Sequence, residues 1–372
     1  MNLLQSADYL TIDIGFRYIK IAQVRQKKTK EKDELMIINY GIGTTPKGCI
    51  KNGAIKDKER VRKEIQTVIR DNNMTAKSAK IVISGTNIIT RIIMVDKVAE
   101  SELNNKIWDE INACLPINLD EHKVDFKVLG SVKNGDKESV KVFVTAVAKR
   151  IINSYIELLN EVNLKALSVD IPANSVSKFF KKNVTNTETD DWAKKQKNSR
   201  RPLTDTIAVI DLGSETTIVN VLKDKVPEFN RVTLLGSSNI DQAIFNALNL
   251  EKDFEEWAER YKKMYGLVSI NDLNNELEWQ CSNAAKEVMN EVLRNIRMCF
   301  DFYKSRCAGD DISKIYLIGG GSQMKGLKEY FEEHLEAPTY PINQLKIDGI
   351  EFAATLDTGK VSYLINALGA AL

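Results

Sequence analysis

Two distant stretches of this sequence follow the same plan. Residues 9–24, YLTIDIGFRYIKIAQV, and residues 207–222, IAVIDLGSETTIVNVL, each contain an apolar run, the triplet Asp-x-Gly, a few polar or bulky residues and a second apolar run. Apolar runs of this length are typical of strands, and glycine favours a tight turn, so each stretch predicts a β-hairpin. The two copies lie too far apart for a solenoid repeat. We therefore expect two related α/β lobes that each begin with a hairpin.

Length and composition narrow the class of protein without indicating its function. At 372 residues the chain is long enough for two domains. Its net charge of +2 gives no reason to expect binding to nucleic acid or to a membrane, and two histidines are too few for a His-rich metal site. Five scattered cysteines are typical of a reducing compartment, and no stretch resembles a signal peptide or a membrane span. We expect a cytoplasmic protein that meets membranes only through partners.

The rest of each lobe reads as an alternation of helices and strands. Helical spacing of apolar residues predicts helices at 58–73 and 283–306, and a further helix runs from Ser101 to Pro116. Residues 122–148 have the pattern of a hairpin. These elements fit the α/β class for both halves of the chain.

A third glycine turn follows a strand near the end of the chain. Residues 313–335, SKIYLIGGGSQMKGLKEYFEEHL, predict a buried strand, three glycines and a helix. Glycine turns let a ligand approach the backbone, exposed N–H groups bind anions, and an Asp beside them can hold the waters of Mg²⁺. We expect the three turns to converge on one cleft, two around phosphates and one against a nucleoside. The pattern is not a P-loop, because Lys325 precedes Gly326, and no G-x-G-x-x-G follows the first strand.

These motifs together resemble the actin-like ATPase superfamily, which includes actin, DnaK-type chaperones, sugar kinases and FtsA. IDIGFRYIK is similar to its first phosphate motif, VIDLGSETT to its second and YLIGGGSQMKGL to its adenosine motif. ALSVDIPANSV and SYLINALGAAL resemble its two segments that connect the lobes. Within the superfamily, SELNNKIWDEINACLPINLDEHKVDFKVLG and RNIRMCFDFYKSR are similar to the PilM family of type IV pilus assembly. FtsA carries a basic amphipathic helix at its end, whereas this chain ends in LGAAL.

The resemblance implies an α/β, actin-like two-lobed fold made of duplicated ribonuclease-H-like lobes, with an inserted subdomain of the FtsA and PilM type. The expected division is a first-lobe core at 1–85, 149–182 and 360–372, the insertion at 86–148, a second-lobe core at 204–235 and 313–359, and a helical subdomain at 236–312. Residues 183–203 are polar and non-periodic, which indicates a linker or loop. Its basic end could touch anionic lipid, although an ordinary solvated loop is the better explanation.

The resemblance also implies ATP and Mg²⁺ as cofactors and gives roles to all three turns. Asp13 and Asp211 would face Mg²⁺ through water, Gly15 and Gly213 would bring backbone N–H groups to the β- and γ-phosphates, and Lys20 would be a phosphate-facing lysine. The full set expected around the phosphates is Asp13, Gly15, Phe16, Arg17, Lys20, Asp211, Gly213, Ser214, Glu215 and Thr216. The set expected around adenosine is Gly236, Gly319, Gly320, Gly321, Ser322 and Met324. Ser322 would also cap the following helix.

Some residues have both a functional and a structural explanation. Lys20 fits a surface lysine on a strand, and the hydroxyl of Thr217 fits either a phosphate contact or the β-propensity of a strand start. Asp170 is the candidate catalytic residue, as a general base like that of sugar kinases, or else a structural acid at a strand end. Arg294 and Arg297 could reach the nucleotide from the long helix or stay in solvent.

The first turn departs from the family pattern. PilM proteins have small hydroxyl residues after Asp-x-Gly, whereas this chain has Phe16, Arg17 and Tyr18. The serine hydroxyls that would contact phosphate are lost. Arg17 either replaces them by pairing with phosphate or points to solvent.

The function that the resemblance implies is an ATP-binding scaffold of the type IV pilus platform, and at most a slow Mg-dependent ATPase. It would bind the N-terminal cytoplasmic tail of the membrane protein PilN in a groove between the first lobe and the insertion, together with other platform proteins, at the inner face of the membrane. Nucleotide would close the lobes. The alternatives are a sugar-type kinase and an FtsA-like filament former. Whether the chain forms a homo-oligomer stays open.

Overall fold

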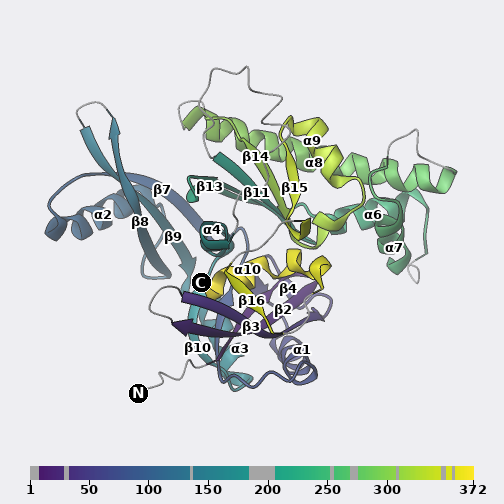
Figure 1. The fold of residues 1–372 in the computed structure, drawn as a ribbon, viewed down its shortest axis with the longest axis horizontal. Helices are drawn as coiled ribbons and strands as arrows, with labels where there is room; N and C mark the ends of the chain where they lie inside the picture. The colour runs from purple at the N-terminus through teal and green to yellow at the C-terminus, as the bar shows by residue number, and fades with distance from the viewer. Residues whose placement is uncertain are drawn as a thin grey trace.

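The fold is built on two mixed β-sheets, one for each half of the chain (Figure 1). The computed structural model describes residues 8–28, 33–134, 137–183, 206–251, 255–268, 275–306, 310–344, 349–353 and 357–372. The first sheet has the order β10-β6-β1-β2-β3-β16. Its strands are β1 Tyr9–Ile14, β2 Tyr18–Lys28, β3 Asp33–Thr44, β6 Ser78–Val82, β10 Lys165–Asp170 and β16 Ile350–Phe352.

The second sheet repeats the plan of the first. Its order is β13-β12-β11-β14-β15. Its strands are β11 Thr206–Leu212, β12 Thr217–Lys223, β13 Val226–Thr233, β14 Lys314–Ile318 and β15 Thr339–Pro341. Each sheet begins with three consecutive antiparallel strands, β1-β2-β3 in the first sheet and β11-β12-β13 in the second. A later strand then pairs in parallel with the first of these, and one more strand pairs in parallel with that later strand. The two hairpins predicted from the repeated sequence plan are therefore the first two strands of two sheets with the same topology.

Helices cover the outer faces of both sheets. In the first lobe α1 (Lys58–Asp71) and α3 (Lys149–Glu161) pack into its core, beside the short β4–β5 hairpin (Ile50–Lys51 and Ala54–Ile55). Those of the second lobe are α6 Ser237–Ala247, α7 Glu255–Tyr265, α8 Glu276–Arg306 and α9 Leu327–Leu335, with 3₁₀ turns η3 Gly320–Gln323, η4 Ile342–Gln344 and η5 Thr358–Lys360. The predicted helices at 58–73 and 101–116 are confirmed within two residues at each end, and the long helix begins before residue 283, at Glu276.

Two helices lie between the sheets and form a core that belongs to both lobes. These are α4 (Pro172–Asn183) and α10 (Val361–Ala371), seen at the centre of Figure 1. Phe179 and Phe180 of α4 and the buried side of α10 pack with residues of both sheets. Gly369 allows this close crossing, because a Cβ there would lie 3.0 Å from the Cα of Ser175 and nearer still to the carbonyl of that residue. The small residues of the last helix are therefore explained by packing against α4.

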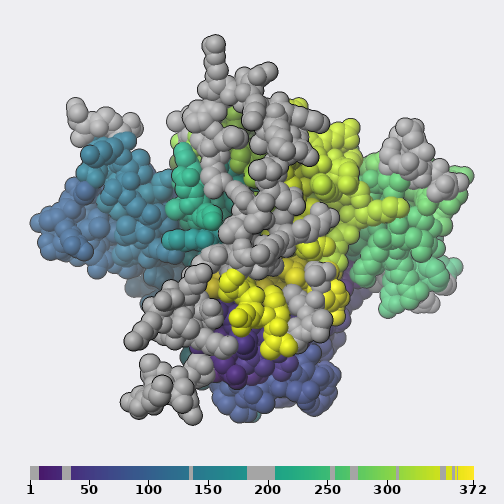
Figure 2. Space-filling view, viewed as in Figure 1, coloured from purple at the N-terminus to yellow at the C-terminus, as the bar shows by residue number. Residues whose placement is uncertain are grey.

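The insertion forms a separate small layer. Its strands β7 (Ile89–Asp96), β8 (His122–Asn134) and β9 (Lys137–Ala148) make a sheet in the order β7-β9-β8, covered by α2 (Glu100–Cys114) with its own apolar core. In Figure 2 the insertion lies on one side of the molecule, and the surface around α6 and α7 lies on the opposite side. The insertion also touches the second lobe, where Lys141 pairs with Glu228 at 2.7 Å between Nζ and Oε1.

One boundary of the expected division is wrong. That division puts residues 350–352 in the second lobe, but β16 pairs in parallel with β3 of the first sheet, from Ile350 opposite Leu35 onward. A three-residue strand has too little pattern to predict its partner. Most of the expected linker at 183–203 lies outside the described residues, and the rest of the division stays a prediction. Within the described part of the chain, no helix is both long and apolar enough to cross a membrane.

Candidate functional site

The two Asp-x-Gly turns have the same backbone geometry. In the first lobe the N–H of Gly15 donates to the carbonyl of Tyr18 at 2.9 Å, and in the second the N–H of Gly213 donates to the carbonyl of Thr216 at 2.9 Å. Each bond closes a hairpin with a two-residue tip. Both glycine N–H groups are therefore used inside their own turns. The expected contact between backbone N–H groups and phosphates stays a prediction, and it would fall to the N–H groups at the tips of the turns.

The two turns and the glycine loop line one cavity of about 360 Å³ between the lobes. This size lies within the range of small-molecule sites, roughly 300–1,000 Å³. All ten residues expected around phosphates line it, and so do Gly319, Gly320, Gly321 and Met324 from the adenosine set. The prediction that the three glycine turns converge on one cleft is therefore confirmed.

The glycine loop lies close to the second hairpin because it has no side chains there. Gly319 has a φ of +83°, and a Cβ at this position would meet the carboxylate of Asp211 and lie 2.7 Å from the carbonyl oxygen of Leu212. A Cβ on Gly320 would lie 2.7 Å from the ring of Tyr363. Two of these glycines are thus required by close approach, and one of them by its positive φ as well.

Three hydroxyl or glycine positions have roles that differ from the expected ones. Ser322 does not cap the following helix: its hydroxyl donates to the carbonyl of Gly319 at 2.7 Å, and α9 begins after Gly326, which has no side chain. Thr217 donates to the carbonyl of Leu235 at 2.7 Å, so its hydroxyl is used within the lobe. Gly236 is absent from the cavity lining. It packs against the backbone of the second turn, where a Cβ would meet the carbonyl oxygen of Ser214.

The carboxylates of the two turns have different partners. Asp13 pairs with Lys20, at 2.9 Å between Oδ2 and Nζ. Asp211 is buried and accepts a hydrogen bond of 2.9 Å from the side-chain amide of Asn366 on α10. Burial and the nearby charge of Asp13 raise the pKa of Asp211, although the bond from Asn366 and the charge of Lys20 act the other way. A divalent cation between the two carboxylates would relieve this repulsion.

A family model described as "Type IV pilus assembly protein PilM" matches residues 11–372. The chain belongs to the PilM family. It is similar to a chain in the solved structure of a "PilM-PilN type IV pilus biogenesis complex", with 20% identity over 98% of both chains and a TM-score of 0.76. A chain of the "MamK double helical filament" is 12% identical over 98% of both chains, with a TM-score of 0.52. MreB 5 of Spiroplasma citri bound to AMPPNP is 12% identical over 99% of this chain and 96% of that one, with a TM-score of 0.50. The fold is the actin-like one that the sequence predicted.

One residue that lines the cavity of this PilM-family chain has a buried polar atom without a partner among the described residues. Ser214 lies in the second turn, and its Oγ is buried with no hydrogen-bond partner among the described residues. A buried hydroxyl without a partner is costly, and a phosphate oxygen would satisfy it. The described residues contain no group of three or more His, Cys, Asp or Glu side chains that could hold a metal. Mg²⁺ here would therefore take phosphate oxygens and water besides Asp13 and Asp211, which is its usual preference.

Asp170 and the two arginines of the long helix lie outside the cavity lining. Asp170 pairs with Lys178 at 2.8 Å and accepts a bond of 2.9 Å from Asn174, so it fixes the start of α4. These contacts give it the structural role rather than that of a base. Arg297 donates to the carbonyl of His334 at 2.6 Å, and Arg294 is exposed on α8.

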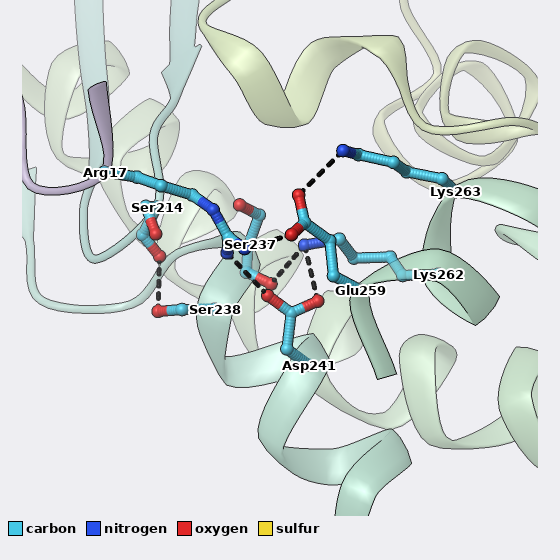
Figure 3. Close-up of polar contacts among 8 residues, drawn as sticks. All are labelled: Arg17, Ser214, Ser237, Ser238, Asp241, Glu259, Lys262 and Lys263. Atoms are coloured by element: carbon cyan, nitrogen blue, oxygen red, sulfur yellow. Dashed lines mark hydrogen bonds and ion pairs between the residues drawn. The ribbon is translucent and has the colours of Figure 1, made fainter. Parts of the chain in front are cut away.

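The three residues that depart from the family pattern all line the cavity, and two of them have clear partners. The ring of Tyr18 packs edge-on against that of Tyr363 on α10, at 5.6 Å between centroids. Arg17 pairs with Asp241 of α6 and with Glu259 of α7, as Figure 3 shows. The expectation that Arg17 meets either phosphate or solvent thus missed a third choice, a contact between the lobes.

Sequence reasoning also missed several residues that line the cavity. Glu259, Lys262 and Lys263 come from α7, and Tyr363 comes from α10 beside Asn366. The charges of EEWAERYKKMY at spacings of three and four could have indicated one polar helix face. A single Asn inside the apolar helix SYLINALGAAL is a similar signal, because a buried amide needs a partner.

Proposed function

We propose that this chain is a nucleotide-dependent scaffold of type IV pilus assembly that binds Mg-ATP between its lobes and the cytoplasmic tail of PilN. The observation that carries the nucleotide half is the single cavity lined by both Asp-x-Gly turns and the glycine loop. Membership of the PilM family supports the pilus half. The similarity to MreB 5 bound to AMPPNP is consistent with a nucleotide site, but at 12% identity it supports only the fold.

In this proposal the second turn does most of the phosphate binding. Ser214 Oγ and the tip of its turn contact phosphate oxygens, and Lys20 supplies a positive charge beside Asp13. Asp13 and Asp211 orient the water ligands of Mg²⁺, which when bound neutralises phosphate charge. Gly319, Gly320 and Gly321 have no side chains, which leaves room for ribose and base. These residues bind and orient, and we assign no catalytic residue because Asp170 does not reach the cavity.

The partner half of the proposal rests on the similarity to the PilM chain of the PilM-PilN complex. We place the PilN tail between the first-lobe core and the insertion, where a hollow of about 10 Å³ lies. Its lining comes from three parts of the chain: Ser84, Gly85 and Ile171 of the first-lobe core, Ile88 and Thr90 of the insertion, and Ile218, Asn230 and Val232 of the second lobe. A peptide cannot enter a hollow of this size unless the insertion moves, so binding of the tail is coupled to the contact with the second lobe. The protein would then sit at the inner face of the membrane through this partner.

Titration calorimetry with a peptide of the PilN tail, with and without Mg-ATP, tests the proposal. We expect binding in both states with different affinities, because a ligand shifts a two-state equilibrium only through differential binding. No binding in either state would remove the partner half. Unchanged Mg-ATP binding in both Asp13→Asn and Asp211→Asn would remove the nucleotide half. No observation among the described residues specifically favours the kinase or the filament alternative.

A further inference from the structure

Arg17 links the first-lobe hairpin to two helices of the second lobe. It lies at the tip of the first-lobe hairpin, and its Nη1 is 3.1 Å from Oδ2 of Asp241 on α6. Its Nη2 pairs with Oε2 of Glu259 on α7. Figure 3 shows the guanidinium between the two carboxylates. The contacts span more than two hundred residues of sequence.

The two carboxylates are held in place from the other side by lysines. Lys262 is buried, lies 2.7 Å from Oδ1 of Asp241 and donates to the carbonyl of Ser237 at 3.0 Å. Lys263 lies 2.8 Å from Oε1 of Glu259. Each carboxylate thus bridges one lysine of α7 and Arg17. An ion pair between side chains that other contacts already hold in place loses less side-chain entropy on forming than one between two mobile side chains.

Burial of the cluster strengthens these contacts. The side chain of Arg17 is 33% exposed and that of Asp241 is 15% exposed, so the guanidinium is partly shielded from water. Burial alone would lower the pKa of Arg17, but the charges of Glu259 and Asp241 more than offset it and raise that pKa. A serine at this position could not span the distance. The departure from the family pattern therefore replaces a phosphate-facing hydroxyl with a cross-lobe ion pair.

We propose that Arg17 is a clasp that holds α6 and α7 against the first-lobe hairpin, and that phosphate in the cavity competes with Glu259 for its guanidinium. Guanidinium N–H groups donate to phosphate oxygens as well as to carboxylate oxygens, so a phosphate could take over the contact that Nη2 makes with Glu259. Arg17 and Glu259 both line the cavity, which places the exchange within reach of a ligand there. The clasp stands on contacts within the chain, whereas its response to phosphate rests on the proposed nucleotide site.

Hydrogen exchange of α6 and α7, measured without ligand, tests the clasp. In Arg17→Gln we expect exchange in these two helices to become about three- to tenfold faster, between the effects of exposed and of buried ion pairs. The control is Arg25→Gln on the same hairpin, which breaks a pair with Asp8 inside the first lobe and leaves α6 and α7 unchanged. Equal exchange in Arg17→Gln and the wild type would overturn the clasp.

Inorganic tripolyphosphate with Mg²⁺ tests the response to phosphate, since it carries no nucleoside that could bridge the lobes. We expect it to speed exchange in α6 and α7 of the wild type and to have no such effect in Arg17→Gln. Glu259→Gln should bind tripolyphosphate more tightly than Glu215→Gln, which removes a cavity carboxylate of the same charge without touching the clasp. Equal affinities in these two variants would refute the competition. If neither tripolyphosphate nor Mg-ATP binds the wild type, the proposed function fails, while the ligand-free result still decides the clasp.

Discussion

The hairpins of the two lobes share a backbone and differ in what their tips do. In both, the strand before the turn carries a buried Asp, and a glycine N–H closes a turn with two residues at its tip. The second tip has a buried hydroxyl at Ser214 without a partner among the described residues, whereas the first tip sends Arg17 across to the other lobe. A duplicated scaffold can thus keep ligand contacts in one copy and devote the other to holding the lobes together. The loss of hydroxyls at the first tip therefore does not imply the loss of the site.

Among changes to the two hairpins, removing the carboxylate of either one should reduce Mg-ATP affinity the most. We expect Asp13→Asn and Asp211→Asn to weaken Mg-ATP binding by about tenfold to a hundredfold, the usual range for groups that orient metal ligands. Asp211→Asn should be the more severe, since this carboxylate is buried and lies beside the turn that we propose binds phosphate. Calorimetry measures both. Asp170→Asn, also at a strand end but outside the cavity, is the control and should bind normally.

Gly319→Ala should lower stability most among the changes at the turns. Its φ of +83° with a ψ of 169° lies in a region essentially open only to glycine, which costs any other residue about 1–3 kcal/mol. Crowding against Asp211 and Leu212 adds about 1–3 kcal/mol. The matched control is Gly48→Ala, which has a similar φ of +78° and nothing within 4 Å of the added Cβ. Chemical unfolding compares the two. Equal losses would mean that the loop does not need its close approach to the second hairpin.

Two hydroxyls of the second hairpin should separate binding from stability. Ser214→Ala should weaken Mg-ATP binding by about three- to tenfold with no loss of stability, because its hydroxyl has no partner within the described protein. Thr217→Ser keeps the hydroxyl, whereas Thr217→Val removes the bond to Leu235 and should cost about 1 kcal/mol without changing affinity. Calorimetry and chemical unfolding of the three variants separate the two effects. The reverse outcome would exchange the roles of the two residues.

The smallest effect should come from the aromatic residue of the first tip. Tyr18→Ser restores a small hydroxyl of the family type but loses the ring contact with Tyr363, worth about 0.5–1.5 kcal/mol in chemical unfolding. Tyr18→Phe keeps the ring and should unfold like the wild type. Gain of nucleotide affinity in Tyr18→Ser would show that the first tip still has the geometry of a phosphate turn.

The features that could be predicted are those that local sequence pattern determines. The hairpins and the glycine loop follow from apolar runs and from glycine, so their place around one cavity could be predicted. The direction of a hydroxyl could not, as Ser322 and Thr217 show, because it depends on which carbonyl the fold brings near. Glu259 and Lys262 were missed because α7 reaches the cavity only through tertiary packing. The pairing of β16 with the first sheet was missed for the same reason.

The last helix is fixed at its two ends to different lobes. Near its start, the carbonyl of Ser362 accepts the N–H of Gly319 at 2.9 Å and Asn366 donates to Asp211, both in the second lobe. At its end, the carbonyl of Ala371 accepts bonds from Tyr9 at 2.8 Å and Lys80 at 3.1 Å, both in the first lobe. A motion that separated the lobes along this helix would break one set of these bonds. Rotation of one lobe against the other about the helix axis would also break one set or twist the helix, so α10 ties the two lobes to each other.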